Sequence, residues 1–513
     1  MSEQEKTAVA TEAGGAVSQE QLTQNIFRSY NYVGTKETLA YLFNDFSNSF
    51  NIGGYSERFV LDVVKIDFGI SAIVGLFTGA WDVINDTFIS AIVDNTRTRL
   101  GKFRPYLVLM QIPMSLIGLL YWFLPYMFPD SAPDYMPKLI FWYLFGVITE
   151  TAGTFTGIAK GGYMSTITPN PNERVRLITL AELLTGYMGE DMPGYIFGFL
   201  FDMSSTGRWN IKLRTIFMGM GVGCAVISSI FTFWFFLVTK ERVPQRIERP
   251  DLKTSFRAIF TNYPMLLMCL SSFLGGFGIG TSQQNYWIDI FGGDHMINTA
   301  KALVSGISGP VGSISYAFVK PLRKRFSAKA IWVGSDIYGD MVSLGFFLVG
   351  ITNNNYLKLK PMLTAYGFTE FFSKLLFGVN KVINADLWNQ AMDYCEWKTG
   401  FRMEATTSVA QGLILKAQGI IMGSIQRLVM KKIGYVQGLK IGTQDPSTKF
   451  WLFFLSTVVP LVTSGLGIVP KFLWPMSRKF TAKMYYELSE RRNAMVSGYV
   501  GTVDGAEEVP ESK

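Results

Sequence analysis

Charged side chains are scarce in this sequence, and that scarcity indicates the class of protein. Asp, Glu, Lys and Arg make up 17% of the 513 residues, whereas soluble domains carry about 25%. A soluble chain of this length needs a large charged surface, and this composition does not supply one. A chain that is surrounded by lipid has no such need.

Histidine and cysteine are also nearly absent. His295 is the single histidine, and Cys224, Cys269 and Cys395 are the three cysteines, all far apart in sequence. This spacing provides neither a zinc site nor a disulfide framework. We find no nucleophile–base pair or metal-ligand cluster, so we expect no enzyme activity and no cofactor. Residues 1–25 have no apolar core after a basic start, so we expect no secretory signal peptide here.

Long apolar runs are what the sequence does contain. Hydrophobic residues make up 49% of the chain and the mean hydropathy is +0.22. A bilayer core needs about 20 apolar residues per helix, and a helix satisfies its own backbone hydrogen bonds, which lipid cannot do. The sequence therefore predicts an all-α membrane protein. The clearest apolar stretches are Leu107–Phe128, Lys138–Ile158, Ile216–Val238, Met265–Ile290 and Trp451–Ile468.

The run of apolar segments predicts about twelve spanning helices. We place them near residues 37–60, 67–94, 106–128, 137–166, 176–202, 213–239, 263–290, 297–320, 330–351, 360–392, 403–430 and 449–473. The Gly-rich run at residues 275–280 lies inside the seventh span, where small residues allow close helix contact.

Basic residues gather in the loops after the even-numbered helices. This bias predicts that those loops and both termini lie in the cytoplasm. It also explains the formal net charge of +8 without nucleic acid as a partner. The charged central loop divides the chain into two halves of about six helices, the layout of a major facilitator transporter. The expected divisions are a tail at residues 1–36, a half at 37–239, a loop at 240–262, a half at 263–475 and a tail at 476–513.

Two carboxylates lie within the second predicted span, in the sequence Trp81-Asp82-Val83-Ile84-Asn85-Asp86. Asp82 and Asp86 are four residues apart, so they share one helix face. A charge at the centre of a bilayer costs roughly 3 kcal/mol on insertion scales, so both should face the bundle or a wet cavity. Such a pair can bind a hard monovalent cation or share a proton, with Asn85 in support. The alternative is a structural pair that is satisfied by a lysine or arginine of another helix.

A lysine lies deep in the eleventh predicted span. Lys416 is too far from either end of that helix for its ammonium to reach water easily, so it needs a partner. Asp82 and Asp86 are the natural candidates, and Gln418 lies beside it. In the tenth predicted span, Trp388 offers an aromatic face on which a sugar ring can stack.

Two charged loops are candidates for a cytoplasmic gate. The loop from Asp94 to Tyr106 opens with an acid and then turns basic, and the stretch from Asp393 to Glu404 alternates acids and bases. Acids and bases at the ends of spanning helices can pair across the gap and hold one conformation closed. The alternative for either loop is a solvated, topology-setting charge cluster. The candidate gate residues are Asp94, Arg97, Arg99, Lys102, Arg104, Asp393, Glu396, Lys398, Arg402 and Glu404.

The joint spacing of these features resembles the glycoside–pentoside–hexuronide:cation symporter family, which includes the melibiose permeases. The block from Trp81 to Tyr106 is similar to that family's second helix and following loop, and Asp393–Glu404 to its loop before the eleventh helix. Lys416 falls where the family has a lysine near the cation site. The resemblance covers roughly residues 37–475. It implies coupling of solute movement to H⁺ or Na⁺ by alternating access.

The sequence also departs from the melibiose permeases. Their fourth-helix aspartate, which serves cation and sugar, falls near Gly157, and Lys160 lies one turn further on. Their fifth-helix sugar-binding arginine falls near Ala181 or Glu182. Asp45 lies close to the position of their first-helix sugar-binding aspartate.

We therefore expect a cation-coupled symporter for a sugar, glycoside or related solute in a bacterial-type plasma membrane. An uncoupled facilitator or an exporter of the same fold is the first alternative, since the fourth-helix acid is missing. A non-transporting membrane sensor or scaffold is the second, because the basic C-terminal tail can bind a partner or anionic lipid.

Overall fold

Helices make up the regular structure of this chain. The computed structural model describes residues 32–96, 98, 101–129, 131–168, 173, 176–177, 180–181, 184–241, 260, 262–399, 404–477, 479–488 and 490. Within these ranges every named element is a helix, and one isolated bridge joins Thr98 to Gly101. Seven of the described helices are long and apolar enough to cross a membrane. The predicted all-α membrane class is confirmed.

The chain divides into two compact units. The first contains residues 1–248 together with 294–299 and 436–440, and the second contains residues 249–293, 300–435 and 441–513. Two short segments from the C-terminal part of the sequence thus belong to the first unit. The exact domain limits expected from the sequence stay a prediction.

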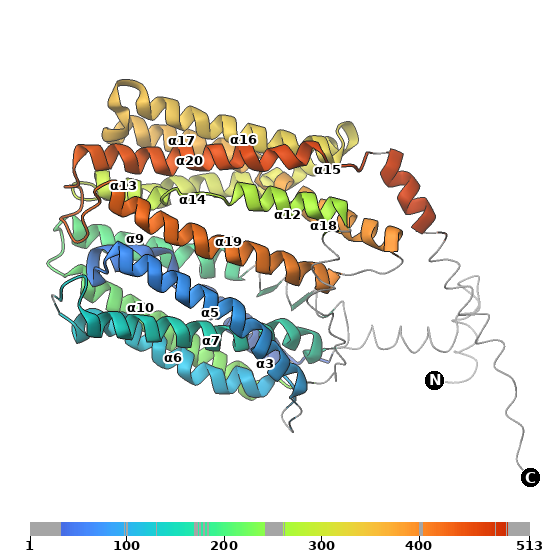
Figure 1. Ribbon diagram of the computed structural model, residues 1–513, viewed down its shortest axis with the longest axis horizontal. Coiled ribbons are helices and arrows are strands. Elements are labelled where there is room, and N and C mark those ends of the chain that lie inside the picture. Colours follow the sequence, from blue (N-terminus) through green and yellow to red (C-terminus); the bar gives the residue numbers. More distant parts are fainter. Residues whose placement is uncertain are drawn as a thin grey trace, which may run out of the picture. The chain divides into compact units, whose positions relative to one another are not determined.

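The first unit is a bundle in which α7 packs against α5 and α6, and α10 packs against α3 and α6 (Figure 1). Asp67 begins α5, because its carboxylate accepts hydrogen bonds from the backbone of Gly69 at 2.8 Å and of Ile70 at 3.1 Å. The helices of this unit are α3 (Thr35–Ser49), η1 (Gly53–Tyr55), α4 (Ser56–Arg58), η2 (Phe59–Val64), α5 (Phe68–Asn95), α6 (Arg104–Met127), α7 (Met136–Ile167), η3 (Thr185–Asp191), α9 (Met192–Ser205) and α10 (Leu213–Val238).

In the second unit α20 packs against α12, α13 and α16 (Figure 1). Its helices are α12 (Tyr263–Gly275), α13 (Gln283–Phe291), α14 (Ile297–Ser315), η4 (Tyr316–Phe318), α15 (Val319–Arg325), α16 (Ala328–Ile351), η5 (Thr352–Leu357), α17 (Leu359–Leu375), α18 (Phe377–Thr399), α19 (Glu404–Lys432) and α20 (Pro446–Phe472). The first three residues of α14 belong to the first unit.

Several predicted spans are not continuous helices. The expected helix at 37–60 ends at Ser49, and short helical pieces follow from Gly53. The expected helix at 263–290 stops at Gly275 and resumes at Gln283. Both predictions of continuity were wrong, because hydropathy counts apolar residues and does not register where the backbone unwinds. A discontinuous helix in a membrane leaves backbone groups free, and it is tolerated where it is buried in protein or lines a cavity.

Glycines allow the helices of the second unit to approach closely. A Cβ on Gly467 of α20 would lie 3.0 Å from the Ser271 carbonyl oxygen and 3.1 Å from the Gly275 Cα. A Cβ on Gly280 would lie 2.6 Å from the Leu455 carbonyl oxygen. The Gly-rich run therefore packs against the backbone of α20, as its small residues predicted.

Two glycines of α16 give a matched test of this packing. A Cβ on buried Gly350 would lie 2.2 Å from the Phe453 Cζ, whereas a Cβ on Gly345 would meet nothing within 4 Å. Phe453 is fully buried and stacked between Phe347 and Tyr356, so its ring cannot move aside. We expect Gly350→Ala to lower the free energy of unfolding by about 1–3 kcal/mol through overpacking.

The measurement is thermal unfolding of the purified protein in detergent. Gly345→Ala on the same helix is the control and should leave the unfolding temperature unchanged or slightly raised, since alanine favours helix. Equal unfolding temperatures for the two variants would contradict the close packing of α16 on α20.

Candidate functional site

Four oxygen-bearing side chains converge between α5 and α7. Asp82 and Asn85 are 6% and 4% exposed, and Asp86 is half-buried on the same face of α5. The Thr154 Oγ1 on α7 lies 3.0 Å from the Asp86 Oδ1, 3.1 Å from the Asn85 Oδ1 and 3.5 Å from the Asp82 Oδ1. The helix spacing thus brings the predicted carboxylate pair and its amide to one point, which we call the carboxylate cluster (Asp82, Asn85, Asp86 and Thr154).

The carboxylate cluster has more acceptors than donors. A threonine hydroxyl carries one hydrogen, so Thr154 can donate to one of its three oxygen neighbours at a time. The buried Asn85 Nδ2 finds no hydrogen-bond partner among the described residues. Carboxylate, amide and hydroxyl oxygens gathered in this way suit a hard monovalent cation, or a proton that two carboxylates share.

Thr154 is the member of this cluster that sequence reasoning missed. It lies three residues before Gly157, where the resembling family has its fourth-helix acid. A threonine in an apolar helix usually bonds to its own backbone, so its residue type gives little signal. Its position could be found only by aligning α7 with that family or by packing α7 on α5.

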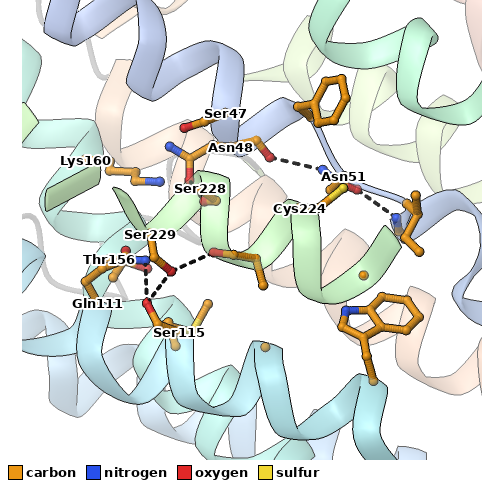
Figure 2. Close-up of a pocket in the computed structure, with 18 residues that line it drawn as sticks. Ser47, Asn48, Asn51, Gln111, Ser115, Thr156, Lys160, Cys224, Ser228 and Ser229 are labelled. Atoms are coloured by element: carbon orange, nitrogen blue, oxygen red, sulfur yellow. Dashed lines mark hydrogen bonds between the residues drawn. The ribbon is translucent and has the colours of Figure 1, made fainter. Parts of the chain in front are cut away.

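A cavity of about 260 Å³ lies between α3, α6, α7 and α10 in the first unit (Figure 2). We call it the first-unit cavity. Its wall includes the Lys160 side chain of α7 and the segment Phe50–Gly53, where α3 ends. Neutral polar and apolar side chains complete the wall. The main ones are Asn48, Gln111, Ser115, Trp122, Thr156, Ser228 and Ser229.

Asp45 lies near this cavity without being part of its described wall. Its Oδ2 accepts a hydrogen bond from the Thr185 Oγ1 at 3.0 Å, and its charge interacts with Lys160. A direct role for Asp45 in binding solute stays a prediction.

The other predicted solute-site residues lie in the second unit. Gln418 is buried on α19 and donates a hydrogen bond to the Phe273 carbonyl oxygen of α12. Lys416 is half-buried on α19. Trp388 packs partly buried against the apolar core around Leu387 and Ala391. The pairing of Lys416 with Asp82 and Asp86, and stacking of a sugar on Trp388, stay predictions.

The predicted gate residues of the first loop bond within the first unit. The backbone nitrogens of Lys102 and Arg104 donate to the Glu241 carboxylate at 2.9 Å and 2.7 Å. The Arg104 guanidinium donates to the Phe236 carbonyl oxygen at 2.6 Å and 3.1 Å. Glu241, which sequence reasoning missed, thus ties this loop to the end of α10. Arg97 and Arg99 and the side chain of Asp94 lie outside the described residues.

The second gate segment meets a helix formed by residues 479–488. Asp393 Oδ2 accepts a hydrogen bond from the Tyr485 hydroxyl at 2.9 Å, and Glu487 Oε2 accepts one from the Trp397 Nε1 at 2.6 Å. Part of the expected C-terminal tail is therefore packed on α18. The pairing of gate residues between halves stays a prediction. Glu396 and Lys398 also lie on α18, whereas Arg402 and the side chain of Glu404 lie outside the described residues.

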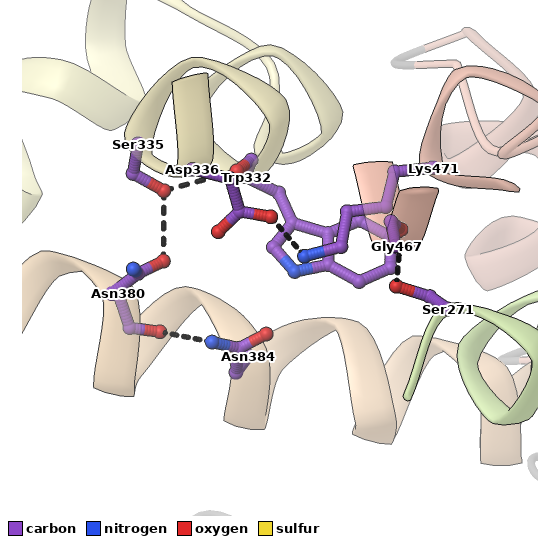
Figure 3. A network of polar contacts seen from close by, with 8 residues as sticks. All are labelled: Ser271, Trp332, Ser335, Asp336, Asn380, Asn384, Gly467 and Lys471. Atoms are coloured by element: carbon purple, nitrogen blue, oxygen red, sulfur yellow. Dashed lines mark hydrogen bonds and ion pairs between the residues drawn. The ribbon is translucent and has the colours of Figure 1, made fainter. Parts of the chain in front are cut away.

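A second pair of carboxylates at the same spacing, Asp336 and Asp340, lies on α16 and was missed. Asp336 forms an ion pair with Lys471 of α20, whose Nζ lies 4.4 Å from the centre of the Trp332 ring (Figure 3). Asp340 accepts a hydrogen bond from Ser464 and lines a cavity of about 520 Å³ with Glu370. The signal was present in the sequence, because the pair repeats the four-residue spacing of Asp82 and Asp86.

Two helical units, discontinuous membrane helices, and polar cavities with carboxylates inside the spans define a secondary transporter of major facilitator type. The sequence matches the family described as MFS/sugar transport protein over residues 40–478. The chain belongs to that family. It is a transporter rather than an enzyme, with the predicted major facilitator fold of two six-helix halves, and it is an integral membrane protein.

Relatives and solved structures agree with this assignment. The chain is 24% identical over 471 residues to the uncharacterized symporter YnaJ of Bacillus subtilis (strain 168), which covers 89% of this chain and 95% of that protein. It is 24% identical over 479 residues to the isoprimeverose transporter of Lactiplantibacillus pentosus, which covers 90% of this chain and 92% of that one. The crystal structure of the nucleoside transporter NupG is similar in fold, with a TM-score of 0.51 and 15% identity over 88% of this chain and 98% of that one.

The geometry of the carboxylate cluster predicts that Thr154 supports cation binding. We expect Thr154→Val to raise the cation concentration needed for half-maximal effect by about tenfold, since a bond to a charged partner contributes about 1.5 kcal/mol or more. The measurement is the rise in unfolding temperature of purified protein with Na⁺, Li⁺ or falling pH.

Thr151→Val is the matched control, because Thr151 lies one turn earlier on α7 and accepts a hydrogen bond from the Trp81 Nε1 at 2.9 Å instead. An unchanged cation dependence in Thr154→Val would show that its hydroxyl is not a ligand.

Proposed function

We propose that this chain moves a sugar, glycoside or related polyhydroxylated solute across a bacterial-type plasma membrane together with H⁺ or Na⁺. The observation that supports coupling is the carboxylate cluster: two acids, an amide and a hydroxyl at one buried point of a membrane helix pair. Ionisable groups at such depth are expensive to bury, and they mark ion pathways. The family assignment and the names of the two relatives support a sugar-type solute and symport.

The proposed mechanism is alternating access. A cation bound between Asp82 and Asp86 removes the repulsion between the two charges, so the loaded cluster is more stable than the empty one. The solute binds close to the same helices, and the complex then opens to the other side of the membrane. Lys416 is proposed to link cation and solute occupancy, and both termini are proposed to lie in the cytoplasm.

An uncoupled facilitator or an exporter is the second candidate. The specific observation is that Gly157 stands where the resembling family has an acid, with open space around the position of its missing Cβ. Solute counterflow that is insensitive to Na⁺ and to pH in the unaltered protein would favour this candidate.

The test of coupling uses proteoliposomes and a solute found by thermal-shift screening of sugars and glycosides, with and without Na⁺ and at two pH values. We expect Asp82→Asn and Asp86→Asn each to reduce gradient-driven accumulation by about tenfold or more, because each removes a charged ligand. Solute counterflow, which needs no gradient, should persist in both variants.

Asp134→Asn is the matched control, since Asp134 is exposed in the loop before α7 and should leave accumulation unchanged. Intact accumulation in both α5 variants would overturn the assignment of the coupling site.

A further inference from the structure

We infer that the solute carries a negatively charged group, and that the Lys160 ammonium binds this group in the first-unit cavity. The inference rests on the proposed transport function, and it adds the charge of the solute and the residue that selects it.

Lys160 is the only charged side chain among the eighteen described residues that line the first-unit cavity. The close-up shows its amine directed toward the region enclosed by α3, α6 and α10 (Figure 2). An ammonium facing a wall of neutral groups attracts an anion more strongly than it would in bulk water, because the surrounding dielectric is low.

Asp45 is an acidic neighbour of Lys160 that lies outside the described cavity wall. It interacts electrostatically with Lys160, yet the two form no ion pair in the described structure. Thr185 donates to the Asp45 carboxylate at 3.0 Å and so helps to hold it away from the cavity wall. Asp45 therefore leaves the cavity side of the Lys160 ammonium available.

The neutral wall suits hydroxyl groups next to the anion. The Gln111 Nε2 and the Ser229 hydroxyl donate to the Ser115 hydroxyl at 3.2 Å and 2.7 Å, and the Ser228 hydroxyl donates to the Asn48 Oδ1 at 3.3 Å. These groups retain further donor and acceptor capacity. The chemistry therefore fits a small polyhydroxylated carboxylate or sulfonate.

The carboxylate cluster and the proposed anion site each include one residue of α7. Thr154 and Lys160 are six residues apart on α7, so they lie about 120° apart around its axis, on different faces. One monovalent cation at the first site and one monoanion at the second add no net charge to the first unit. Symport of the pair in equal numbers is therefore electroneutral.

The test measures binding to the purified full-length protein by calorimetry, with probes that differ in charge. The acidic probes are D-glucuronate and 2,3-dihydroxypropane-1-sulfonate, and the neutral ones are D-glucose, glycerol and isoprimeverose. We expect at least one acidic probe to bind about tenfold tighter than its neutral counterpart, since charged hydrogen bonds are the stronger ones. Lys160→Gln should remove that preference and Lys160→Arg should keep it, while Ser229→Ala should weaken acidic and neutral probes alike.

The inference fails if the unaltered protein binds neutral probes as tightly as acidic ones, or binds no acidic probe at millimolar concentration. This comparison decides the matter even if Lys160→Gln does not fold. Cation-driven accumulation of a neutral sugar would overturn the inference and leave the proposed function standing. Binding of an acidic probe without any gradient-driven accumulation would overturn the proposed function instead.

Discussion

The need to satisfy charge inside a hydrocarbon layer governs this structure. Charged side chains within the described spans lie beside specific polar or charged neighbours: Asp86 beside Thr154, Asp336 beside Lys471, and Lys160 near Asp45. In water these contacts would contribute little, because exposed ion pairs are worth about 0–1 kcal/mol. In a membrane the alternative is an unpaired charge, so the same contacts decide which helix faces turn inward. Helix rotation, and with it the shape of each bundle, follows from them.

Interrupted helices provide the second constraint, and they recur in both halves. The first predicted helix of each half breaks, at residues 50–52 and at 276–282. Each break contributes to the wall of a cavity that the third, fourth and sixth predicted helices of the same half complete. This correspondence is what an internal repeat produces. The two cavities differ in charge, since Lys160 lines one while Asp340 and Glu370 line the other. The repeat has kept its architecture while its chemistry has diverged.

Sequence reasoning found the features that depend on composition and on spacing along one helix. The membrane class, the helical architecture and the Asp82–Asp86 pair all follow from such local patterns. It missed features that depend on how one segment meets another. Thr154 matters only because α7 packs on α5, and Glu241 only because the loop before α6 folds back onto the end of α10. Sequence reasoning did not find the breaks within the first and seventh predicted helices, because hydropathy counts apolar residues and does not report where the backbone leaves the helical conformation. Asp336 and Asp340 could have been found by the rule that found Asp82 and Asp86.

The placement of the two proposed sites on α7 gives coupling a physical form. A helix is stiff over the six residues that separate Thr154 from Lys160, so a small rotation of α7 that tightens one site also moves the other. Coupling requires each ligand to prefer the same conformation of the carrier. The two α5 carboxylates of the empty cluster repel each other; a bound cation removes that repulsion, and its contact with Thr154 draws α7 toward α5. The orientation of Lys160 then depends on whether the cation is present. Solute selection and ion coupling are, on this proposal, two consequences of how one helix is held.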